Sequence, residues 1–295
     1  MKRTTAIRET KGDRIFLSIL YVISFLILAI EIYPLIYVIS ASFSSSDAIS
    51  LGQVYLLPVD PNLEGYKMLL ENKNILQGFK NSVIYLCVGT TINMLLTILL
   101  AYPLSRKEMA GRNIITLLVV LTMYVQGGLI PTFLLVNNLG MVDTIWGLIM
   151  PGAISTTNMI IMRTYFQNSI PDTLHEAAVL DGCNYTRYLL MIVLPLSMPI
   201  IAVVGLYYAV GHWNTYFDAL IYLRSTEKQN LQLVLRNILL ANQVNSGDGS
   251  FSESAKLGVT IKYAVIVVSC VPMMIAYPFV QKFFVKGVMI GALKG

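Results

Sequence analysis

One stretch of the sequence combines residue types whose spacing predicts a short amphipathic helix with a sharp turn behind it, and it reads SIPDTLHEAAVLDGCNYTRYLLMIVLPLSMPI. Pro171 and the Thr173-x-x-Glu176 spacing predict the start of a short helix, because proline suits a first turn and that spacing is typical of a capping box. The Ala177-Ala178 pair leaves one face of this helix without bulk, so another surface can approach it closely. Gly182 predicts a left-handed turn that ends the helix.

Isolated polar residues inside apolar stretches are a second set of candidates. Tyr124, Gln126 and Asn158 suit the lining of a passage, and polar contacts between packed helices are the alternative. Glu31 is a carboxylate within an apolar run, and such a group indicates a function by default. It would line a cavity or pair with a basic residue, or else be solvated near the outer interface; both interpretations stay open.

A cluster of aromatic and amide side chains lies at the end of another apolar run. Such side chains suit a sugar, because rings cover its apolar face while amides bond its hydroxyl groups. Trp and Tyr also gather in belts at membrane interfaces, and this alternative explains the aromatic residues equally well. His212 and Asn214 are harder to explain as belt residues. The members are Tyr207, Tyr208, His212, Trp213, Asn214, Tyr216, Phe217 and Asp218.

The common catalytic and metal-binding motifs are absent from the sequence. It contains no GxxxxGK[ST] loop that would cradle a nucleotide phosphate, and no HExxH. The two histidines, His175 and His212, are too few and too far apart for a histidine-based metal site. The three cysteines have no short spacing, so neither a disulfide framework nor a CxxC site is expected.

The composition indicates which environment must position these residues. The chain has 295 residues, of which 56% are hydrophobic and 13% charged, and its mean hydropathy is +0.67. A soluble domain carries roughly 25% charged residues. The composition therefore excludes a soluble enzyme, a disordered chain and a nucleic-acid binder, and it predicts an integral membrane protein.

Long stretches without charged residues predict six transmembrane helices, each of at least about 20 apolar residues. The first is too long for the core of a signal peptide and is expected to be retained. Residues 1–14 form a cytoplasmic N-terminal segment, and 15–295 are expected to form one all-α transmembrane domain. The predicted spans are about 15–42, 81–104, 113–135, 144–162, 189–213 and 262–283.

The distribution of Lys and Arg in the short loops predicts the orientation. Basic residues are concentrated in the N-terminal segment, the 103–113 loop and the C-terminal tail, whereas the 136–143 loop has none. Short cytoplasmic loops carry such an excess, so both termini and the 169–188 loop are expected in the cytoplasm. The longer loop at 218–260 is then expected outside.

The 169–188 loop also carries the residues of a known pattern. Glu176-Ala177-Ala178 is followed after three residues by Gly182, and after nine more by Ile192-x-Leu194-Pro195. This is the full EAA-loop pattern, and through it the chain resembles the carbohydrate permease subunits of ABC importers, of the MalG and LplC type. The resemblance extends to Asn81-Ser82 and to the tail FVKGVMIGALKG. It implies the type I importer permease fold in a bacterial cytoplasmic membrane.

The resemblance implies a transport subunit without ATPase activity of its own. In this family the EAA helix docks into a groove on a cytoplasmic ATPase and transmits its closure to the membrane helices. The implied partners are a second permease, two ATP-binding subunits and an extracellular solute-binding protein, with ATP and Mg²⁺ held by the ATPase. No cofactor is expected on this chain. The residues assigned to coupling are Glu176, Ala177, Ala178, Leu180, Asp181, Gly182 and Tyr185.

The expected cargo is a sugar or oligosaccharide that passes through a pathway formed half by this chain. The alternatives are an importer permease for phosphate, a polyamine or a peptide, and an autonomous secondary transporter. Few charges within the predicted spans suit a neutral or weakly charged cargo. The candidate pathway residues are Glu31, Tyr124, Gln126, Asn158, Tyr208, His212, Trp213, Asn214 and Tyr216.

Overall fold

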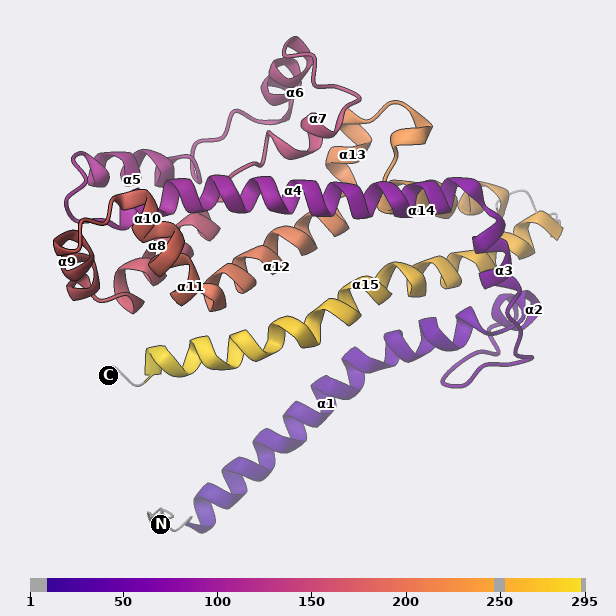
Figure 1. Ribbon diagram of the computed structural model, residues 1–295. Coiled ribbons are helices and arrows are strands. Elements are labelled where there is room, and N and C mark those ends of the chain that lie inside the picture. The colour runs from indigo at the N-terminus through magenta and orange to yellow at the C-terminus, as the bar shows by residue number, and fades with distance from the viewer. Residues whose placement is uncertain (1–9, 247–252, 293–295) are drawn as a thin grey trace. The chain divides into compact units, whose positions relative to one another are not determined.

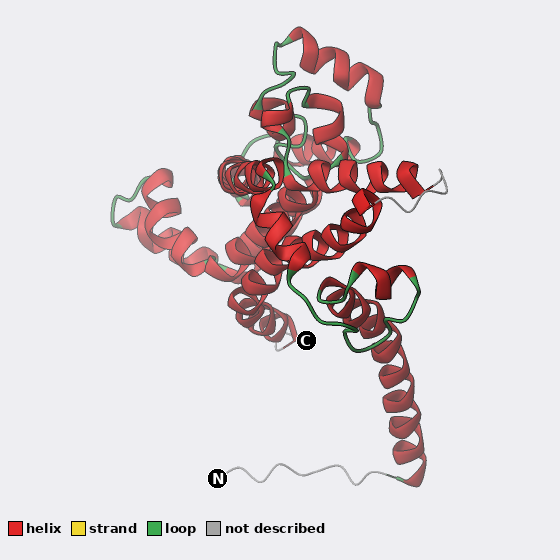
Figure 2. Ribbon diagram, turned by 90° about the vertical axis from the view of Figure 1, so that its right-hand side faces the viewer, coloured by secondary structure: helices red, strands yellow, loops and turns green. Residues whose placement is uncertain are grey.

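A computed structural model describes residues 10–246 and 253–292. All regular structure in these residues is helical, as the composition predicts (Figure 2). The chain divides into two compact units, each of which is described here by itself. The first contains residues 1–71 and 238–268, and the second contains residues 72–237 and 269–295.

The first unit contains the long helix α1 (Lys11–Ser42) and two short helices, α2 (Ser46–Ser50) and α3 (Glu64–Glu71). Thr10 and Asp13 form a capping box that fixes the start of α1. Residues 10–36 are exposed on every side of the helix, although most of them are apolar. Such exposure is expected of a surface that faces lipid. A small core at the end of α1 consists of Ala41, Ala48, Ile49 and Val54.

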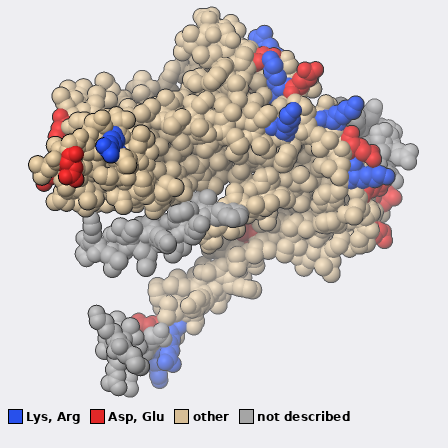
Figure 3. Space-filling model, in the orientation of Figure 1, with Lys and Arg blue, Asp and Glu red and all other residues tan. Residues whose placement is uncertain are grey.

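The second unit is organised around α4 (Lys73–Ser105), which packs against α8 (Thr156–Ser169) and α12 (Met198–Asn214) (Figure 1). Its main core includes Leu104, Met162, Phe166, Val193 and Val204, all almost completely buried. On the face seen in Figure 3, the Lys, Arg, Asp and Glu side chains lie in separate groups, and most of the remaining surface is uncharged. That distribution is typical of a helix bundle that spans a bilayer.

Shorter elements connect these long helices within the second unit. They are α5 (Arg112–Leu121), α6 (Leu129–Asn138), α7 (Ile145–Ile149), α9 (Asp172–Leu180), α10 (Tyr185–Tyr188), the π-helix η1 (Leu189–Val193), α11 (Leu194–Leu196), α13 (Phe217–Tyr222) and the 3-10 turn η2 (Thr226–Lys228). Two further helices contribute to both units, α14 (Leu231–Ser246) and α15 (Glu253–Ala292). Of the predicted outer loop and the C-terminal tail, residues 247–252 and 293–295 lie outside the described residues.

Three helical segments of the described chain are long and apolar enough to cross a membrane: α1, α4 and residues 258–278 of α15. Residues 185–196 and α12 form a bent pair with 83° between its two parts, and this pair counts as a fourth segment if it is one span. The bend follows Ser197, between Pro195 and Pro199, where prolines interrupt the helical hydrogen bonds. The count of six spans and the side on which the termini lie stay predictions.

Besides the bent 189–213 span, two of the predicted spans are not continuous helices. The 113–135 segment contains α5 and α6 with a non-helical stretch at 122–128, and the 144–162 segment contains α7 and α8 with another at 150–155. Gly127-Gly128 and Pro151-Gly152 lie in these breaks, and both pairs are typical of turns. Counting charge-free residues misses such breaks because it measures length and polarity only. In addition, α4 begins at Lys73, eight residues before the predicted 81.

Candidate functional site

The predicted docking helix is α9, and it begins two residues earlier than the predicted capping box implies. Pro171 is its N-cap and makes no side-chain capping bond, and Asp172 is the first helical residue. Thr173 therefore lies inside the helix, so the capping box predicted between Thr173 and Glu176 does not form. A carboxylate in the first turn, supplied by Asp172, still favours the positive end of the helix dipole.

Gly182 ends α9 in the left-handed conformation that the sequence predicts, with φ of +74°. Its N–H donates to the carbonyl of Val179 at 3.0 Å, and the N–H of Cys183 donates to the carbonyl of Ala178 at 2.9 Å. This pair of bonds is a Schellman motif, which satisfies carbonyls that would otherwise lack a partner. A Cβ added at Gly182 would meet no atom within 4 Å. What favours glycine at this position is therefore the positive φ angle alone.

The two alanines of α9 lie on different surfaces. Ala178 is buried and belongs to the main core of the second unit, whereas Ala177 and Glu176 are exposed. Leu180 is 89% exposed, and Asp181 beside it is exposed as well. The helix is thus fixed to the core through one alanine while its outer face presents a small residue, a carboxylate and a large apolar side chain.

Aromatic rings and one arginine hold α9 against the end of α4. The His175 ring stacks on Tyr185 with 5.5 Å between centroids and meets the Tyr188 ring edge to face at 5.0 Å. Arg106 is only 7% exposed. The central carbon of its guanidinium lies 5.3 Å from the ring centre of Tyr102 and 5.2 Å from that of Tyr188. We call His175, Tyr185, Tyr188, Tyr102 and Arg106 the aromatic mount.

Direct hydrogen bonds add to the aromatic mount. The hydroxyl of Tyr102 donates to the backbone carbonyl of Tyr185 at 3.3 Å. From α8, Arg163 Nε donates to the carbonyl of Leu104 at 2.8 Å, which satisfies a carbonyl at the end of α4. Sequence reasoning used Arg106 only to orient the chain. Its position three residues after the Tyr102-Pro103 pair, in a short basic loop, was the available signal.

An exposed ion pair joins the same two elements. Lys107 Nζ lies 2.7 Å from the Asp172 carboxylate, with side chains 74% and 57% exposed. The hydrogen bond from Lys107 lowers the pKa of Asp172 below its usual value. Because both groups are in solvent, this pair contributes about 0–1 kcal/mol. Arg106, by contrast, is buried beside it, so the aromatic mount carries most of the attachment.

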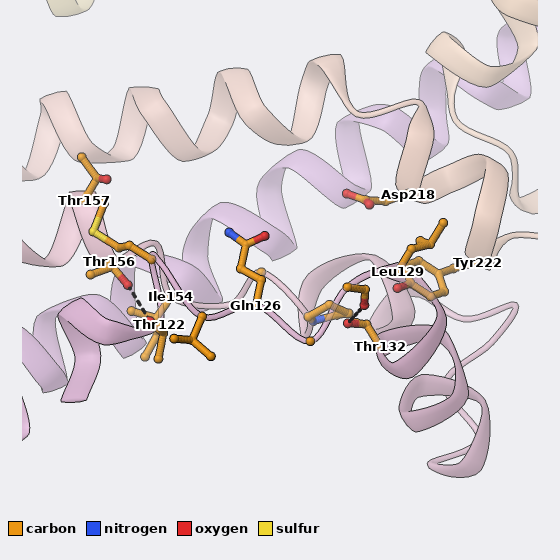
Figure 4. Close-up of a pocket in the computed structure, with 15 residues that line it drawn as sticks. Thr122, Gln126, Leu129, Thr132, Ile154, Thr156, Thr157, Asp218 and Tyr222 are labelled. Carbon is orange, nitrogen blue, oxygen red and sulfur yellow. Dashed lines mark hydrogen bonds between the residues drawn. The ribbon is translucent and has the colours of Figure 1, made fainter.

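A polar pocket opens where the two broken helices meet, with a cavity volume of about 720 Å³. Both breaks line it, and α13 closes one side with Asp218 (Figure 4). The side chain of Gln126 belongs to its lining, as does the contact between the hydroxyls of Thr122 and Thr156, 3.3 Å apart. The remaining lining residues are Met123, Val125, Gly127, Gly128, Leu129, Thr132, Pro151, Gly152, Ile154, Thr157 and Tyr222.

Two members of the predicted aromatic cluster bond inside the fold. The hydroxyl of Tyr208 is 2.7 Å from Thr97 Oγ1 and accepts the N–H of Ser155 at 2.9 Å. Trp213 is buried, and its indole Nε1 donates to the carbonyl of Ser269 at 2.8 Å. Their polar groups are therefore engaged in contacts between helices.

The other members of that cluster differ in exposure. His212 is partly buried, lies 3.2 Å from Asn93 through Nε2, and packs closely against Gly89, where even a Cβ would come within 2.5 Å of the ring. Asn214 and Tyr216 are exposed at the end of α12. The structure thus brings no more than part of the predicted cluster to an accessible surface.

The remaining candidates lie apart from each other. Glu31 is exposed on α1, in the first unit. Tyr124 is 80% exposed in the 122–128 break, next to the pocket residue Val125. Asn158 is buried in the first turn of α8, where its N–H donates to Ser155 Oγ at 3.4 Å. Within residues 10–246 and 253–292, no three His, Cys, Asp or Glu side chains gather as a metal site would require.

An anchoring contact that the sequence did not suggest lies in a loop near α13. The Asp143 carboxylate accepts from the backbone N–H groups of Arg224 and Ser225 at 3.0 Å each and from the Ser225 hydroxyl at 2.6 Å. Lys228 Nζ lies 2.9 Å from the same carboxylate. These donors, the Ser225 hydroxyl foremost, hold the pKa of Asp143 well below its usual value. Asp143 adopts φ of +60°, so the backbone there is strained unless these bonds form.

Comparison with known proteins gives one consistent result. Residues 93–290 match the family of binding-protein-dependent transport system inner membrane components. The chain is 41% identical over 285 residues to the polygalacturonan/rhamnogalacturonan transport system permease protein YtcP of Bacillus subtilis, covering 96% of this chain and 99% of YtcP. It is 37% identical to Protein LplC of Bacillus subtilis, over the full length of both chains.

A solved structure agrees with the sequence comparison. A chain from the crystal structure of a bacterial ABC transporter involved in the import of the acidic polysaccharide alginate superimposes with a TM-score of 0.85 and 32% identity. The match covers 95% of this chain and all of that one. The fold expected from the EAA loop is thereby confirmed, and the chain belongs to the family of binding-protein-dependent transport system inner membrane components.

Proposed function

We propose that this chain is the permease subunit of an ATP-driven importer and forms half of the pathway for a sugar or oligosaccharide. The observation that carries the proposal is α9: a helix with the EAA sequence, fixed to the core through Ala178 and open to a partner at Ala177 and Leu180. The carbohydrate names of the relatives support a saccharide over phosphate, a polyamine or a peptide.

The coupling step follows from how α9 is attached. A groove on an ATPase subunit that closes on ATP binding would grip the exposed face formed by Glu176, Ala177 and Leu180. The aromatic mount ties α9 to the end of α4, so displacement of α9 moves a long helix of the second unit. Coupling also requires that the groove bind α9 with different affinity in its open and closed states. The Schellman turn at Gly182 keeps α9 at a fixed angle to η1.

The remaining partners follow from what one subunit lacks. The proposed complex contains two ATP-binding subunits that hold ATP and Mg²⁺, a second permease, and an extracellular binding protein that delivers the cargo. Catalysis of ATP hydrolysis belongs to the ATP-binding subunits, and this chain is not an enzyme. Among the predicted pathway residues, Gln126 and Tyr124 are accessible at the broken third segment and are retained as pathway residues.

The test is co-purification followed by uptake into proteoliposomes. The tagged chain, extracted in mild detergent from its native host, is expected to bring an ATPase and a second permease in stoichiometric amounts. Gly182→Asp places a charge in the Schellman turn and is expected to leave assembly intact while uptake falls at least tenfold. Gly111→Asp is the matched control, because Gly111 is also left-handed, at φ of +75°, with open space around it.

The two variants separate backbone strain from coupling. Both positions impose about the same left-handed penalty on a non-glycine residue, roughly 1–2 kcal/mol. If Gly182→Asp imports as well as the parent, the coupling role of α9 is wrong. A chain that purifies alone, under conditions that preserve other complexes, contradicts the importer assignment altogether.

A further inference from the structure

We propose that the pocket between the two broken helices is a contact site for a neutral, hydroxyl-rich saccharide on this subunit. The proposal rests on the importer function above and names the chemistry of its cargo. Three observations on the pocket support it. Irregular backbone forms part of its wall, hydroxyl and amide groups line it, and the single charged residue of its described lining, Asp218, is negative.

The position of the breaks indicates a wet cavity. Residues 122–128 and 150–155 interrupt two segments that are otherwise apolar and free of charge. Irregular backbone at membrane depth is tolerated only where protein buries it or where it lines a water-filled cavity. The breaks line one pocket together, and Val125 is 75% exposed within it. A pocket open to water, or to a cargo that replaces water, satisfies this condition, and so would a partner subunit that covers the breaks.

The threonine hydroxyls of the pocket use their protons within the fold and keep acceptor lone pairs for a ligand. Thr122 Oγ1 donates its proton to the carbonyl of Val119 at 2.6 Å, and Thr132 Oγ1 donates to the carbonyl of Gly128 at 2.7 Å. Each hydroxyl oxygen keeps lone pairs that can accept from a ligand. The Gln126 amide both donates and accepts. Hydroxyl groups of a sugar suit this lining, because each of them donates and accepts as well.

The charge of the pocket disfavours an acidic cargo. Asp218 is the one charged residue of the described lining, which includes neither Lys nor Arg. Uronate carboxylates are recognised by bidentate arginine or by lysine, and here they would meet a like charge instead.

The site is tested in the assembled complex by cysteine protection. Thr157→Cys places a thiol on the exposed part of the lining, in a chain whose Cys87, Cys183 and Cys270 are replaced by serine and which still assembles with its partners. Ser50→Cys, exposed on α2 in the other unit, is the control. The probes are a mixture of neutral galacto- and arabino-oligosaccharides and a mixture of oligogalacturonates of the same length, each competing with a small maleimide.

Neutral oligosaccharides are expected to slow labelling at position 157 and not at position 50, at concentrations where oligogalacturonates have no effect. Asp218→Asn removes the like charge while keeping an acceptor oxygen. It is expected to lower the half-protecting concentration of oligogalacturonate roughly two- to fivefold, the size of an exposed charge interaction. The neutral probes are expected to change less than the acidic ones.

Each contrary result has a distinct meaning. Equal or better protection by oligogalacturonate overturns the neutral-cargo proposal. A thiol at 157 that never reacts in the complex, or that no saccharide protects, overturns the contact site, because a partner subunit then fills the pocket or the cargo passes elsewhere. ATP-driven uptake by the parent complex is measured in parallel. If uptake proceeds without protection, the importer function stands and only the inference fails.

Discussion

The aromatic mount and the Asp143 anchor, formed by Asp143 with Arg224, Ser225 and Lys228, each attach a loop to the helix bundle. They do so through different kinds of interaction. Asp143 is held by directional, charge-assisted hydrogen bonds from Ser225, Lys228 and two backbone N–H groups. Such bonds are strong but weaken steeply with distance and angle. The aromatic mount relies on broad contacts between rings and a guanidinium, which tolerate small shifts of position.

The difference indicates which attachment is built to move. A loop that transmits force must stay connected while it shifts, and a face-to-cation contact keeps most of its energy over such shifts. A loop that only needs a fixed shape gains more from a carboxylate with every acceptor site engaged. The helix next to the aromatic mount also exposes Leu180, the residue proposed to meet a partner, whereas the Asp143 contacts are all made within one unit.

The largest effect is expected from Arg106→Gln. It removes the cation from between two rings, a loss of roughly 0.5–2 kcal/mol for each contact. Displacement of α9 would then no longer reach α4, and uptake driven by the binding protein is expected to fall about tenfold or more. Purified complexes in proteoliposomes, assayed for cargo imported and ATP hydrolysed in the same sample, measure this ratio.

Two controls identify the cause of such a loss. Arg106→Lys retains a charge but not the flat guanidinium, so it is expected to recover uptake only in part. Arg187→Gln removes an exposed arginine from α10, outside the aromatic mount, and is expected to import normally. Unchanged coupling in Arg106→Gln, with normal assembly, would show that α9 acts on the bundle by another route.

The sequence predicted the α9 helix and the turn that ends it because their signals are local, whereas the role of these residues in coupling stays a prediction. Gly182 is needed for one backbone angle, and the EAA spacing is read along a single helix. The aromatic mount was missed since Tyr102 and Arg106 are more than 60 positions from His175, and only folding brings them together. The capping box prediction was wrong for a local reason: the helix begins at Asp172, one residue before Thr173, so Thr173 is not the N-cap.

The pathway residues were harder to predict for a related reason. The aromatic and amide residues at 207–218 fit a sugar site by composition. The polar groups of Tyr208 and Trp213, however, form hydrogen bonds with the backbone of Ser155 and Ser269. Composition does not reveal which partner a hydroxyl finds. The pocket depends instead on two breaks in different segments, and a test for charge-free length cannot find them. Gly127-Gly128 and Pro151-Gly152 were the readable signals.

A smaller effect is expected from Asp143→Asn, and it should fall on stability. The amide keeps one oxygen but loses the charge that strengthens the bonds from Ser225 and Lys228, at a cost of roughly 1–2 kcal/mol. The temperature of half-inactivation of the complex should therefore drop by a few degrees, about 2–4 °C per kcal/mol. Import per folded complex should match the parent. A loss of coupling without a loss of stability would mean that this anchor also moves.

The pH dependence of stability sharpens the same contrast. The folded protein holds the pKa of Asp143 below its unfolded value of about 3.9, so the bonds contribute fully above that value. This contribution is lost as the pH falls from about 5 through the unfolded pKa toward the folded one. Thermal inactivation measured from pH 6 down to pH 2 should show the parent losing stability faster than Asp143→Asn below about pH 4, because the group no longer titrates in the variant. Parallel curves would contradict the assignment.

The smallest effect is expected from breaking the ion pair between Lys107 and Asp172. Both side chains are largely exposed, so their attraction is screened by salt and contributes about 0–1 kcal/mol. Lys107→Ala is therefore expected to lower uptake less than twofold at 0.15 M salt, and Asp172→Asn to behave alike. The decisive measurement is the uptake rate of the two variants and the parent at 0.02 M and at 0.5 M salt. A loss as large as that of Arg106→Gln, erased by salt, would mean that charge rather than ring contact holds α9, and the comparison drawn above would reverse.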